Sequence, residues 1–573
     1  MSNSIFRRKS ISDILTESQR GDADAHKHTL HRVLTVRDLT FFGIAAIIGA
    51  GSFSSLGDAV FRGGPGVVIL FIICGIACAF TALCYSDFAS RIPVAGSAYT
   101  YAYASFGEML AWIIGWALLM EYSIGNIYVA FSWSDYFTSF LQKMNIHVPD
   151  HLTCSYREAH QAFTGTVNNP EWLLAWNSAP AIGGLKIIFD LPAVIINILI
   201  TILVYIGIKE SRNFSNVMVI LKLAIVILVI IIGGALIFSN GLTVNWTPAN
   251  AEGVKSFMPN GFGGVMFAVS GVFFAYIGFD AVSVLAEESK NPQRDLPKGM
   301  ILSLVICTIV YILLSLVLTA AVVYSKFEGV GDPLAFIFEK DNLNVPWMQI
   351  LVSICAVIAM TSVMLVFQMG QPRIWMSMSR DGLLPPAFQK IHPKFKTPSF
   401  ATIVTGLLVG IPILFTDRKF VLDFTSIGTL FAFVLVCGGV LLIPRTKKEP
   451  GKFNMPYVSG KYLFPLIVLG AIIMATILSQ NYFSHLLKID LAADNATFKI
   501  STIVFWLVCI LLAVLAYLKN FSLIPLMGLS TCLYLLTGMS ASNWKWFLIW
   551  FGIGLVIYFL YGYRKSKLAQ ANT

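Results

Sequence analysis

Long apolar segments separated by short polar connectors run through most of this 573-residue chain. A helix that crosses a bilayer needs about 20 predominantly apolar residues, and these segments have that length. We expect fourteen spans, near residues 39–62, 66–90, 108–141, 185–208, 216–239, 261–286, 298–325, 346–372, 399–416, 423–443, 461–480, 501–519, 521–540 and 544–563. The pattern predicts an all-α polytopic membrane protein, because a helix satisfies its own backbone groups inside lipid.

Two of these spans contain helix-breaking residues near mid-depth. The first holds the segment Phe41 to Phe53, whose centre, Gly49 to Ser52, is its poorest helix-forming stretch. The sixth holds Gly278 beside aromatic residues and Asp280. Close helix packing explains either set of glycines taken alone. The two interrupted spans are the first and the sixth, five spans apart, which fits two five-helix units of opposite orientation across the membrane. Breaks at matching places in two such units are typical of a ligand site, and we favour this interpretation.

Composition agrees with a membrane protein, since 57% of the residues are hydrophobic and only 12% are charged. The N-terminal Arg7, Arg8 and Lys9 precede polar sequence, which does not resemble a cleaved signal peptide. We assign most of the 40 Lys and Arg residues to the side of the N-terminus, and an even number of spans puts both termini there. Basic residues mark the cytoplasmic side, so the net charge of +10 indicates topology and contact with anionic lipid instead of nucleic-acid binding. We expect a multi-pass protein of the plasma (inner) membrane with cytoplasmic termini.

Residue clusters for enzymatic or metal chemistry are not evident in the sequence. Of the nine cysteines only Cys154 falls in a predicted outer loop, and no cysteine or histidine spacing is typical of a metal site. We find no phosphate-binding Gly-Lys-Ser/Thr loop and no Ser/His/Asp cluster at membrane depth. The sequence predicts neither an enzyme nor a resident cofactor or metal.

The chain divides into five parts by these criteria. Residues 1–37 form a cytoplasmic N-terminal tail. Residues 38–240 and 241–445 hold five spans each and are the expected repeats. Residues 446–563 hold four more spans, which we interpret as scaffold or an oligomer surface, and residues 564–573 form a cytoplasmic C-terminal tail.

Two charged residues lie within spans. Glu121 is roughly 20 Å from the inner end of the third span at 1.5 Å per residue, too deep to reach the surface. It is either functional or a structural polar contact between helices. Lys222 is only about 10 Å from the inner end of the fifth span by the same rise, so it either extends to the cytoplasmic surface or is a buried amine that gains and loses a proton.

Three segments resemble a known family. Ile48 to Phe53 resembles the IGxGIF signature of the amino acid–polyamine–organocation (APC) superfamily, with Ser52 in place of the usual aliphatic residue. Phe273 to Ser283 and the following Glu287 to Pro297 are similar to the helix 6–7 signature of its cationic amino acid transporter branch. The ending from Trp544 to Leu568 is similar to the last helix of that branch, and fourteen spans fit it.

The resemblance implies an APC-type fold, a five-plus-five inverted repeat with broken helices 1 and 6 plus four extra helices. In that fold an amino acid's carboxylate meets the amides of Gly49 to Gly51 at a half-helix N-terminus. Its ammonium meets carbonyls left free near Ile47 and in Phe274, Ala275 and Ile277, and Phe274 closes over the substrate. The implied substrate-binding residues are Ile47, Ile48, Gly49, Ala50, Gly51, Ser52, Phe274, Ala275 and Ile277.

The resemblance also implies a proton-coupling residue. Lys222 matches the helix 5 lysine of bacterial members, which takes the place that a sodium ion holds in sodium-coupled relatives. Glu121 matches an acidic position of their helix 3 motif. Glu121, Asp280, Met360 and Thr361 are further pocket candidates, although hydroxyls in membrane helices usually bond to carbonyls of their own helix.

The sequence therefore predicts a secondary amino acid transporter that works by alternating access, with proton symport of L-amino acids as the favoured mode. Neutral or broad specificity is favoured over cationic, because Glu121 is the only acidic residue well placed for a cationic side chain. The alternatives are a sodium-independent exchanger or uniporter, a polyamine carrier, and a transporter-like sensor. The expected partners are an amino acid, a proton and membrane lipid, while a homo-oligomer or a small accessory membrane subunit is left open.

Overall fold

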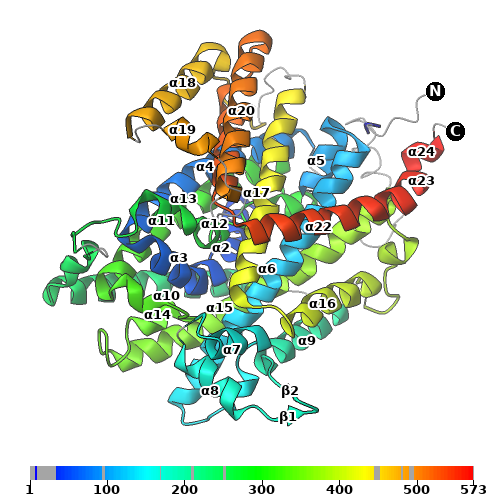
Figure 1. The fold of residues 1–573 in the computed structure, drawn as a ribbon. Helices are drawn as coiled ribbons and strands as arrows, with labels where there is room; N and C mark the ends of the chain where they lie inside the picture. Colours follow the sequence, from blue (N-terminus) through cyan, green and yellow to red (C-terminus); the bar gives the residue numbers. More distant parts are fainter. Residues whose placement is uncertain are drawn as a thin grey trace.

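The computed structural model describes residues 7–9, 34–92, 97–167, 169–207, 212–249, 253–395, 397–443, 452–478, 482–488 and 496–571. Helices make up nearly all regular structure among these residues (Figure 1). The strands that the described ranges contain are two residues long each, β1 (Ala181–Ile182) and β2 (Leu185–Lys186), paired antiparallel in one loop. The predicted all-α polytopic fold is confirmed.

Nine described helices are long and apolar enough to cross a membrane. They are, or include, α4 (Val67–Arg91), α6 (Glu108–Lys143), α10 (Arg212–Ser239), α13 (Pro292–Ala321), α15 (Pro346–Arg380), α17 (Arg418–Leu442), α18 (Gly460–Leu478), α20 (Ala496–Lys519) and α22 (Ala541–Ile557). Three apolar helices are shorter: α9 (Leu191–Ile206), α16 (Ser399–Ile413) and α21 (Leu523–Thr537). Together with the two broken segments below, these helices match the predicted spans in order and place.

The first predicted span is broken where the glycines lie. Helix α2 (Val36–Ile47) ends before Gly49, and a π-helical turn η1 (Gly51–Ser55) leads into α3 (Leu56–Gly63). The second half then continues through the turn η2 (Gly64–Gly66) into α4.

The sixth predicted span is broken as well. Helices α11 (Gly261–Phe267) and α12 (Val269–Phe274) are followed by an irregular segment and then by the 3-10 helix η5 (Asp280–Glu288). Gly278 has φ +118° in that segment, a backbone conformation that residues with a Cβ atom rarely adopt. Glycine is therefore the residue that permits this break.

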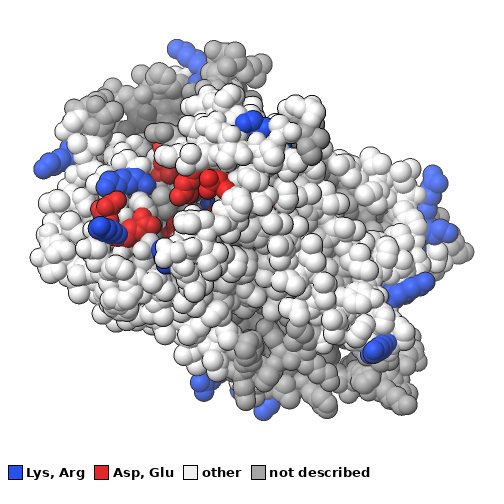
Figure 2. All heavy atoms as spheres, turned by 90° about the horizontal axis from the view of Figure 1, so that it is seen from below, with Lys and Arg blue, Asp and Glu red and all other residues white. Residues whose placement is uncertain are grey.

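The two broken segments are surrounded by long helices. Helix α13 packs against α2 and α4, and α6 packs against α15 and α17. Helices α18 and α20 pack against each other at the edge of the bundle, at the top of Figure 1, while α21 joins them to α4 and α17. In Figure 2 the acidic side chains gather in one place on the face shown, with basic side chains beside them, and further basic side chains are scattered around the face.

The bundle has two ends. One carries the loop helices η3 (Asp150–Leu152), α7 (Tyr156–Phe163), α8 (Pro170–Ser178), η4 (Leu242–Trp246), η6 (Tyr324–Phe327) and α14 (Pro333–Phe336), and we call it the α7–α8 end. The other, the termini end, carries α5 (Ser97–Ser105), η7 (Pro386–Gln389), η8 (Tyr558–Gly562), α23 (Tyr563–Lys565) and α24 (Lys567–Ala571). The short helix α19 (Tyr482–Leu487) packs on α18 and α20.

At the termini end, part of the N-terminal tail is packed on the body. The ammonium of Lys9 lies 2.9 Å from the carboxylate of Asp381, which also accepts a hydrogen bond of 2.6 Å from the hydroxyl of Tyr99. The guanidinium of Arg7 lies over the ring of Tyr563, 5.1 Å from its centroid. Residues 34–37 of the predicted tail are also described, and α2 begins among them at Val36, whereas the rest of the predicted tail lies outside the described residues.

Candidate functional site

The two breaks lie against each other. A Cβ atom on Gly51 would be 2.5 Å from the Cα atom of Ala275, and one on Gly278 would be 2.9 Å from the carbonyl of Ala46. Only backbones without side chains can approach this closely. The candidate residues from two segments more than 200 positions apart therefore share one place in the fold, as the sequence predicts.

A helix N-terminus faces the site from the first break. The carbonyl oxygen of Gly49 accepts hydrogen bonds of 3.0 Å from the N–H groups of both Ser52 and Phe53, so the second half-helix begins at Ala50. The first N–H groups of a helix have no partner in that helix and carry its positive dipole end. The amides of Ala50 and Gly51 thus have the position expected of a carboxylate-binding group.

The carbonyl end of α2 faces the same site. The ammonium of Lys222 donates a hydrogen bond of 3.2 Å to the carbonyl oxygen of Ala45, and the hydroxyl of Tyr311 donates one of 2.9 Å to that of Ile47. The resemblance implies a free carbonyl near Ile47, whereas the carbonyl oxygen of Ile47 already has one donor. Because a carbonyl oxygen has two lone pairs, it can still accept a second hydrogen bond.

Lys222 is buried. Its side chain comes from α10, and only 1% of the residue is exposed. Of the two alternatives for this residue, extension to the membrane surface is excluded, and the ammonium lies at the first break.

An aromatic pair lies beside the second break. The ring of Phe274 meets the ring of Tyr128 edge to face, with centroids 4.7 Å apart. The hydroxyl of Tyr128 donates a hydrogen bond of 3.3 Å to the hydroxyl oxygen of Ser54. The covering role of Phe274 that the resemblance implies stays a prediction, and Tyr128 is a neighbour of Phe274 that sequence reasoning did not single out.

Comparison with known proteins decides the family. The family described as Amino acid permease matches residues 34–489, and the one described as C-terminus of AA_permease matches residues 522–566. The chain belongs to the amino acid permease family. The APC resemblance is thereby confirmed, and the protein is a transporter, not an enzyme.

Several relatives match this permease over most of its length. It is 36% identical to the branched-chain amino acid permease BcaP of Bacillus subtilis (strain 168) over 571 residues, 100% of both chains. It is 34% identical to the methylthioribose transporter of the same organism over 568 residues, 99% of both chains. It is also 34% identical to the vacuolar cationic amino acid transporter 4 of Arabidopsis thaliana over 442 residues, 77% of this chain and 67% of that protein.

Two carboxylates of the permease are buried near the second break. Glu121 on α6 is 3% exposed and Asp280, the first residue of η5, is 2% exposed. Among the residues described, Oε2 of Glu121 and Oδ1 of Asp280 have no hydrogen-bond partner. A carboxylate at membrane depth is costly unless it is protonated, paired or hydrated, so both stay candidates for a functional role.

The two candidates on α15 differ in their surroundings. The hydroxyl of Thr361 donates a hydrogen bond of 2.8 Å to the carbonyl of Val357 and accepts one of 2.9 Å from the indole N–H of Trp133. These bonds favour helix packing as its role. Met360 is fully buried, and Val363, three residues on, contacts the first break, where a Cβ on Gly49 would lie 2.6 Å from its Cγ2.

Ser52, which departs from the family signature, makes a hydrogen bond within its own helical turn. Its hydroxyl donates a hydrogen bond of 3.0 Å to the carbonyl of Gly49. The hydroxyl of Ser55 binds the carbonyl of Gly271 at 2.9 Å and so ties the two broken segments together. The polar departure therefore stabilises the break and leaves the amides of Ala50 and Gly51 unobstructed by this side chain.

Proposed function

We propose that this permease is a secondary active transporter that carries L-amino acids with protons by alternating access. The observation that carries the proposal is the buried ammonium of Lys222 at the carbonyl end of α2, where the two breaks touch. Charged groups and half-helix ends that converge at the contact of two broken helices are typical of transporter substrate and ion sites.

The substrate's backbone groups are recognised by the breaks in this proposal. The carboxylate binds the amides at Ala50 and Gly51, and the ammonium binds the carbonyls of Ile47 and Phe274. Both breaks present main-chain groups, which every L-amino acid can meet in the same way. Selectivity among amino acids then depends on the side chains that surround the site.

Neutral, apolar side chains fit the surroundings best. Phe274, Met360 and Val363 are buried apolar residues at or near the breaks, and apolar walls favour an apolar side chain. The relative named as a branched-chain amino acid permease matches the whole chain. The buried acidic pair Glu121 and Asp280 is the feature that would instead receive a cationic side chain.

Proton coupling is assigned to Lys222. When charged, its ammonium makes a charge-assisted hydrogen bond to Ala45 and holds α2 against α10. Loss of the proton weakens that bond and frees the first half of the broken span to move. Binding of a proton and movement of α2 are then linked, which is what symport requires.

Topology completes the proposal. Residues 38–240 and 241–445 act as the two inverted repeats, and residues 446–563 as the scaffold. The excess of basic residues that we assign to the side of the termini favours a cytoplasmic termini end, with the α7–α8 end outside the plasma membrane. Substrate would enter from the α7–α8 end, past Phe274 and Tyr128.

Uptake into proteoliposomes tests the proposal. The panel is labelled leucine, isoleucine, valine, arginine and lysine with methylthioribose and a polyamine, each with and without an inward proton gradient. We expect gradient-stimulated uptake of the branched-chain amino acids and no effect of sodium. Uptake of methylthioribose alone, or of the polyamine alone, would overturn the amino acid assignment, and binding without flux would overturn transport.

A further inference from the structure

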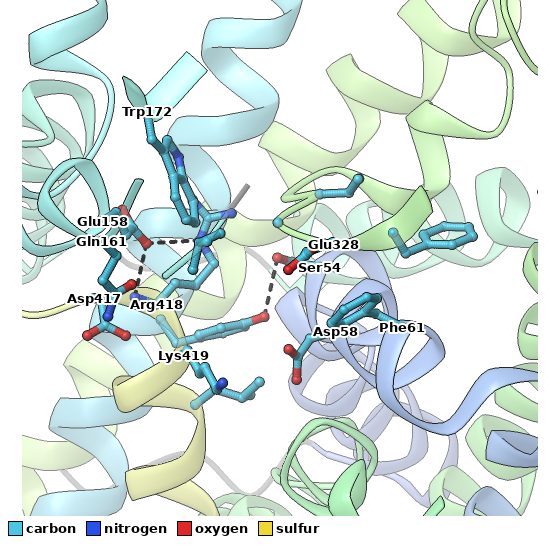
Figure 3. A pocket seen from close by; sticks show the side chains of 16 residues that line it. Ser54, Asp58, Phe61, Glu158, Gln161, Trp172, Glu328, Asp417, Arg418 and Lys419 are labelled. Atoms are coloured by element: carbon cyan, nitrogen blue, oxygen red, sulfur yellow. Dashed lines mark hydrogen bonds and ion pairs between the residues drawn. The ribbon is translucent and has the colours of Figure 1, made fainter. Parts of the chain in front are cut away.

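Charged side chains gather at both ends of the bundle, but their partners differ. At the α7–α8 end, Glu158 and Arg418 line one cavity (Figure 3) and lie 3.9 Å apart, so a loop helix and a spanning helix supply the two charges. At the termini end, the cations that pair with Glu108 and Asp381 come from residues 7–9 of the N-terminal tail. We call residues 7–9 the strap.

The strap bridges three segments of the body. The ammonium of Lys9 pairs at 2.9 Å with Asp381, directly after α15, and the N–H of Lys9 donates a hydrogen bond of 3.4 Å to the carbonyl oxygen of Tyr103 on α5. The carbonyl oxygen of Arg7 accepts a hydrogen bond of 2.8 Å from the N–H of Glu108, the first residue of α6. The strap therefore fastens α5 and α6 to the end of α15.

The C-terminal helices bind the same two acidic residues. The carboxylate of Glu108 accepts hydrogen bonds of 3.1 Å from the hydroxyl of Tyr558 and of 2.5 Å from the hydroxyl of Ser566. The carbonyl oxygen of Asp381 accepts one of 3.1 Å from the N–H of Lys567. The surface to which the strap binds is therefore held together by contacts that do not involve the strap.

The strap is built so that it can leave this surface as a unit. Residues 7–9 lie in neither a helix nor a strand, and the side chain of Arg8 is exposed between those of Arg7 and Lys9. The guanidinium of Arg7 comes no closer than 4.0 Å to the carboxylate of Glu108. Segments of this kind open at a low free energy while the rest of a protein stays folded.

The strap lies at the level where spanning helices meet the membrane surface. Glu108 begins the apolar span of α6, and Asp381 directly follows the apolar span of α15. In the proposed orientation this end faces the cytoplasmic leaflet, whose anionic headgroups attract clustered Lys and Arg residues. Arg7, Arg8 and Lys9 are three consecutive cations. Lipid phosphates and the two carboxylates therefore compete for the same segment.

We propose that the strap is an autoinhibitory brace of the termini end, and that anionic lipid headgroups release it. The bound strap ties α5 to α15. Helix α5 also packs on α4, where the rings of Tyr101 and Phe88 stack with centroids 5.0 Å apart. Release of the strap frees α4 and α5 to move relative to α15, which opens this end for substrate. The effect on transport rests on the proposed function, whereas the competition for the strap does not.

Zero-length cross-linking tests the competition in the full-length protein. A carbodiimide joins the amine of Lys9 to the carboxylate of Asp381 as an amide, with loss of water, while the two groups are in contact. Peptide mass spectrometry measures the product in nanodiscs of phosphatidylcholine with and without phosphatidylglycerol. We expect phosphatidylglycerol to lower the yield about fivefold or more, and soluble glycerol phosphate to leave it unchanged.

Each other result of the cross-linking counts against a part of the proposal. No product in either lipid would overturn the bound strap. Equal yields in the two lipids would overturn release by lipid. A fall with glycerol phosphate in phosphatidylcholine alone would show that free phosphate, and not the membrane surface, is the partner.

Uptake of leucine into proteoliposomes tests the restraint. The double variant Arg7→Gln/Lys9→Gln removes the charges that contact the body, and the control Arg8→Gln removes the exposed charge between them. In phosphatidylcholine we expect the double variant to be about threefold faster than wild type and Arg8→Gln to equal wild type. Phosphatidylglycerol should raise the wild-type rate to that of the double variant.

The two experiments separate this inference from the proposed function. Equal rates for wild type and the double variant in phosphatidylcholine would overturn the restraint. A lipid-dependent cross-link with no uptake by any of the proteins would support release of the strap by lipid and overturn the proposed function.

Discussion

The ammonium of Lys222 binds the carbonyl oxygen of Ala45 at 3.2 Å across 177 positions of the chain. This bond joins α10 to the last turn of α2, directly before the first break. Because the carbonyl ends of helices attract cations, a protonated amine stabilises α2 in this position. In the proposed mechanism, the charge of Lys222 is therefore a control on the position of α2.

Replacement of Lys222 by Gln tests that control. Gln keeps a hydrogen-bond donor but cannot carry a charge, so the fold should be retained. We expect uptake driven by an inward proton gradient to fall about tenfold or more, since one charge-assisted bond is worth roughly 1.5–3 kcal/mol. Exchange of internal for external substrate should persist.

The control for this variant is Lys298→Gln, which removes an exposed lysine from α13. Its gradient-driven uptake should equal that of wild type. Full gradient stimulation in Lys222→Gln would show that another group carries the proton.

The second prediction concerns the contact between the two breaks, which the variant Gly51→Ala would disturb. The added methyl group would lie 2.5 Å from the Cα atom of Ala275, whereas packed carbon atoms stay about 3.5–4.0 Å apart. An extra methyl group in such a tightly packed place lowers the free energy of unfolding by roughly 1–3 kcal/mol. We expect a lower melting temperature in detergent and loss of uptake.

A matched control is Gly470→Ala on α18, because a Cβ there meets nothing within 4 Å. This variant should melt at or slightly above the wild-type temperature. Normal uptake by Gly51→Ala would mean that the two breaks are not in tight contact during transport.

The breaks could be predicted from sequence because glycine is itself the chemical signal. Gly49, Gly51 and Gly278 are poor helix formers placed where a plain spanning helix would not need them. The burial of Lys222 could be stated only as one of two alternatives. Its partner is a main-chain carbonyl at Ala45, and such a group leaves no trace in the residue pattern.

The aromatic partners could not be predicted for a different reason. Aromatic residues make up 13% of the chain, so Tyr128 and Tyr311 look like ordinary helix-packing residues in the sequence. Their roles depend on which helices become neighbours, which only the fold decides. The ion pairs of Arg418 could not be predicted either. Glu158 lies on a loop helix, and the pattern of membrane spans does not predict where a loop helix packs.

The ion pairs of Arg418 give a third prediction. Replacing Arg418 by Met removes the guanidinium and leaves the carboxylates of Asp135 and Glu158 without their cation. Breaking a buried pair from one side typically costs 3–5 kcal/mol, so we expect a large fall in melting temperature. The neighbouring Lys419→Met, which removes an exposed charge, should change it little.

A double variant sharpens this test. Arg418→Met together with Asp135→Asn should recover part of the lost stability, because one of the uncompensated charges is then gone. Equal melting temperatures for Arg418→Met and Lys419→Met would show that the pairs contribute nothing to stability.

The fourth prediction concerns pH and Asp190. This residue caps α9, where its carboxylate accepts hydrogen bonds from the N–H of Ala193 at 3.0 Å and the hydroxyl of Ser134 at 2.6 Å. Burial raises the pKa of Asp190 to about 7, although the two hydrogen bonds act in the opposite direction. In the unfolded chain the carboxyl has a pKa of about 3.9.

The sign of the effect follows from these two values. Between about pH 4 and pH 7 the folded protein holds a proton at Asp190 that the unfolded chain has lost, so stability falls as pH rises through this window. Above pH 7 the contribution no longer changes. Asp190→Asn cannot titrate but retains an acceptor for Ala193. Between pH 5 and pH 7.5 its melting temperature should therefore fall less than that of wild type, and parallel curves for the two proteins would contradict the raised pKa.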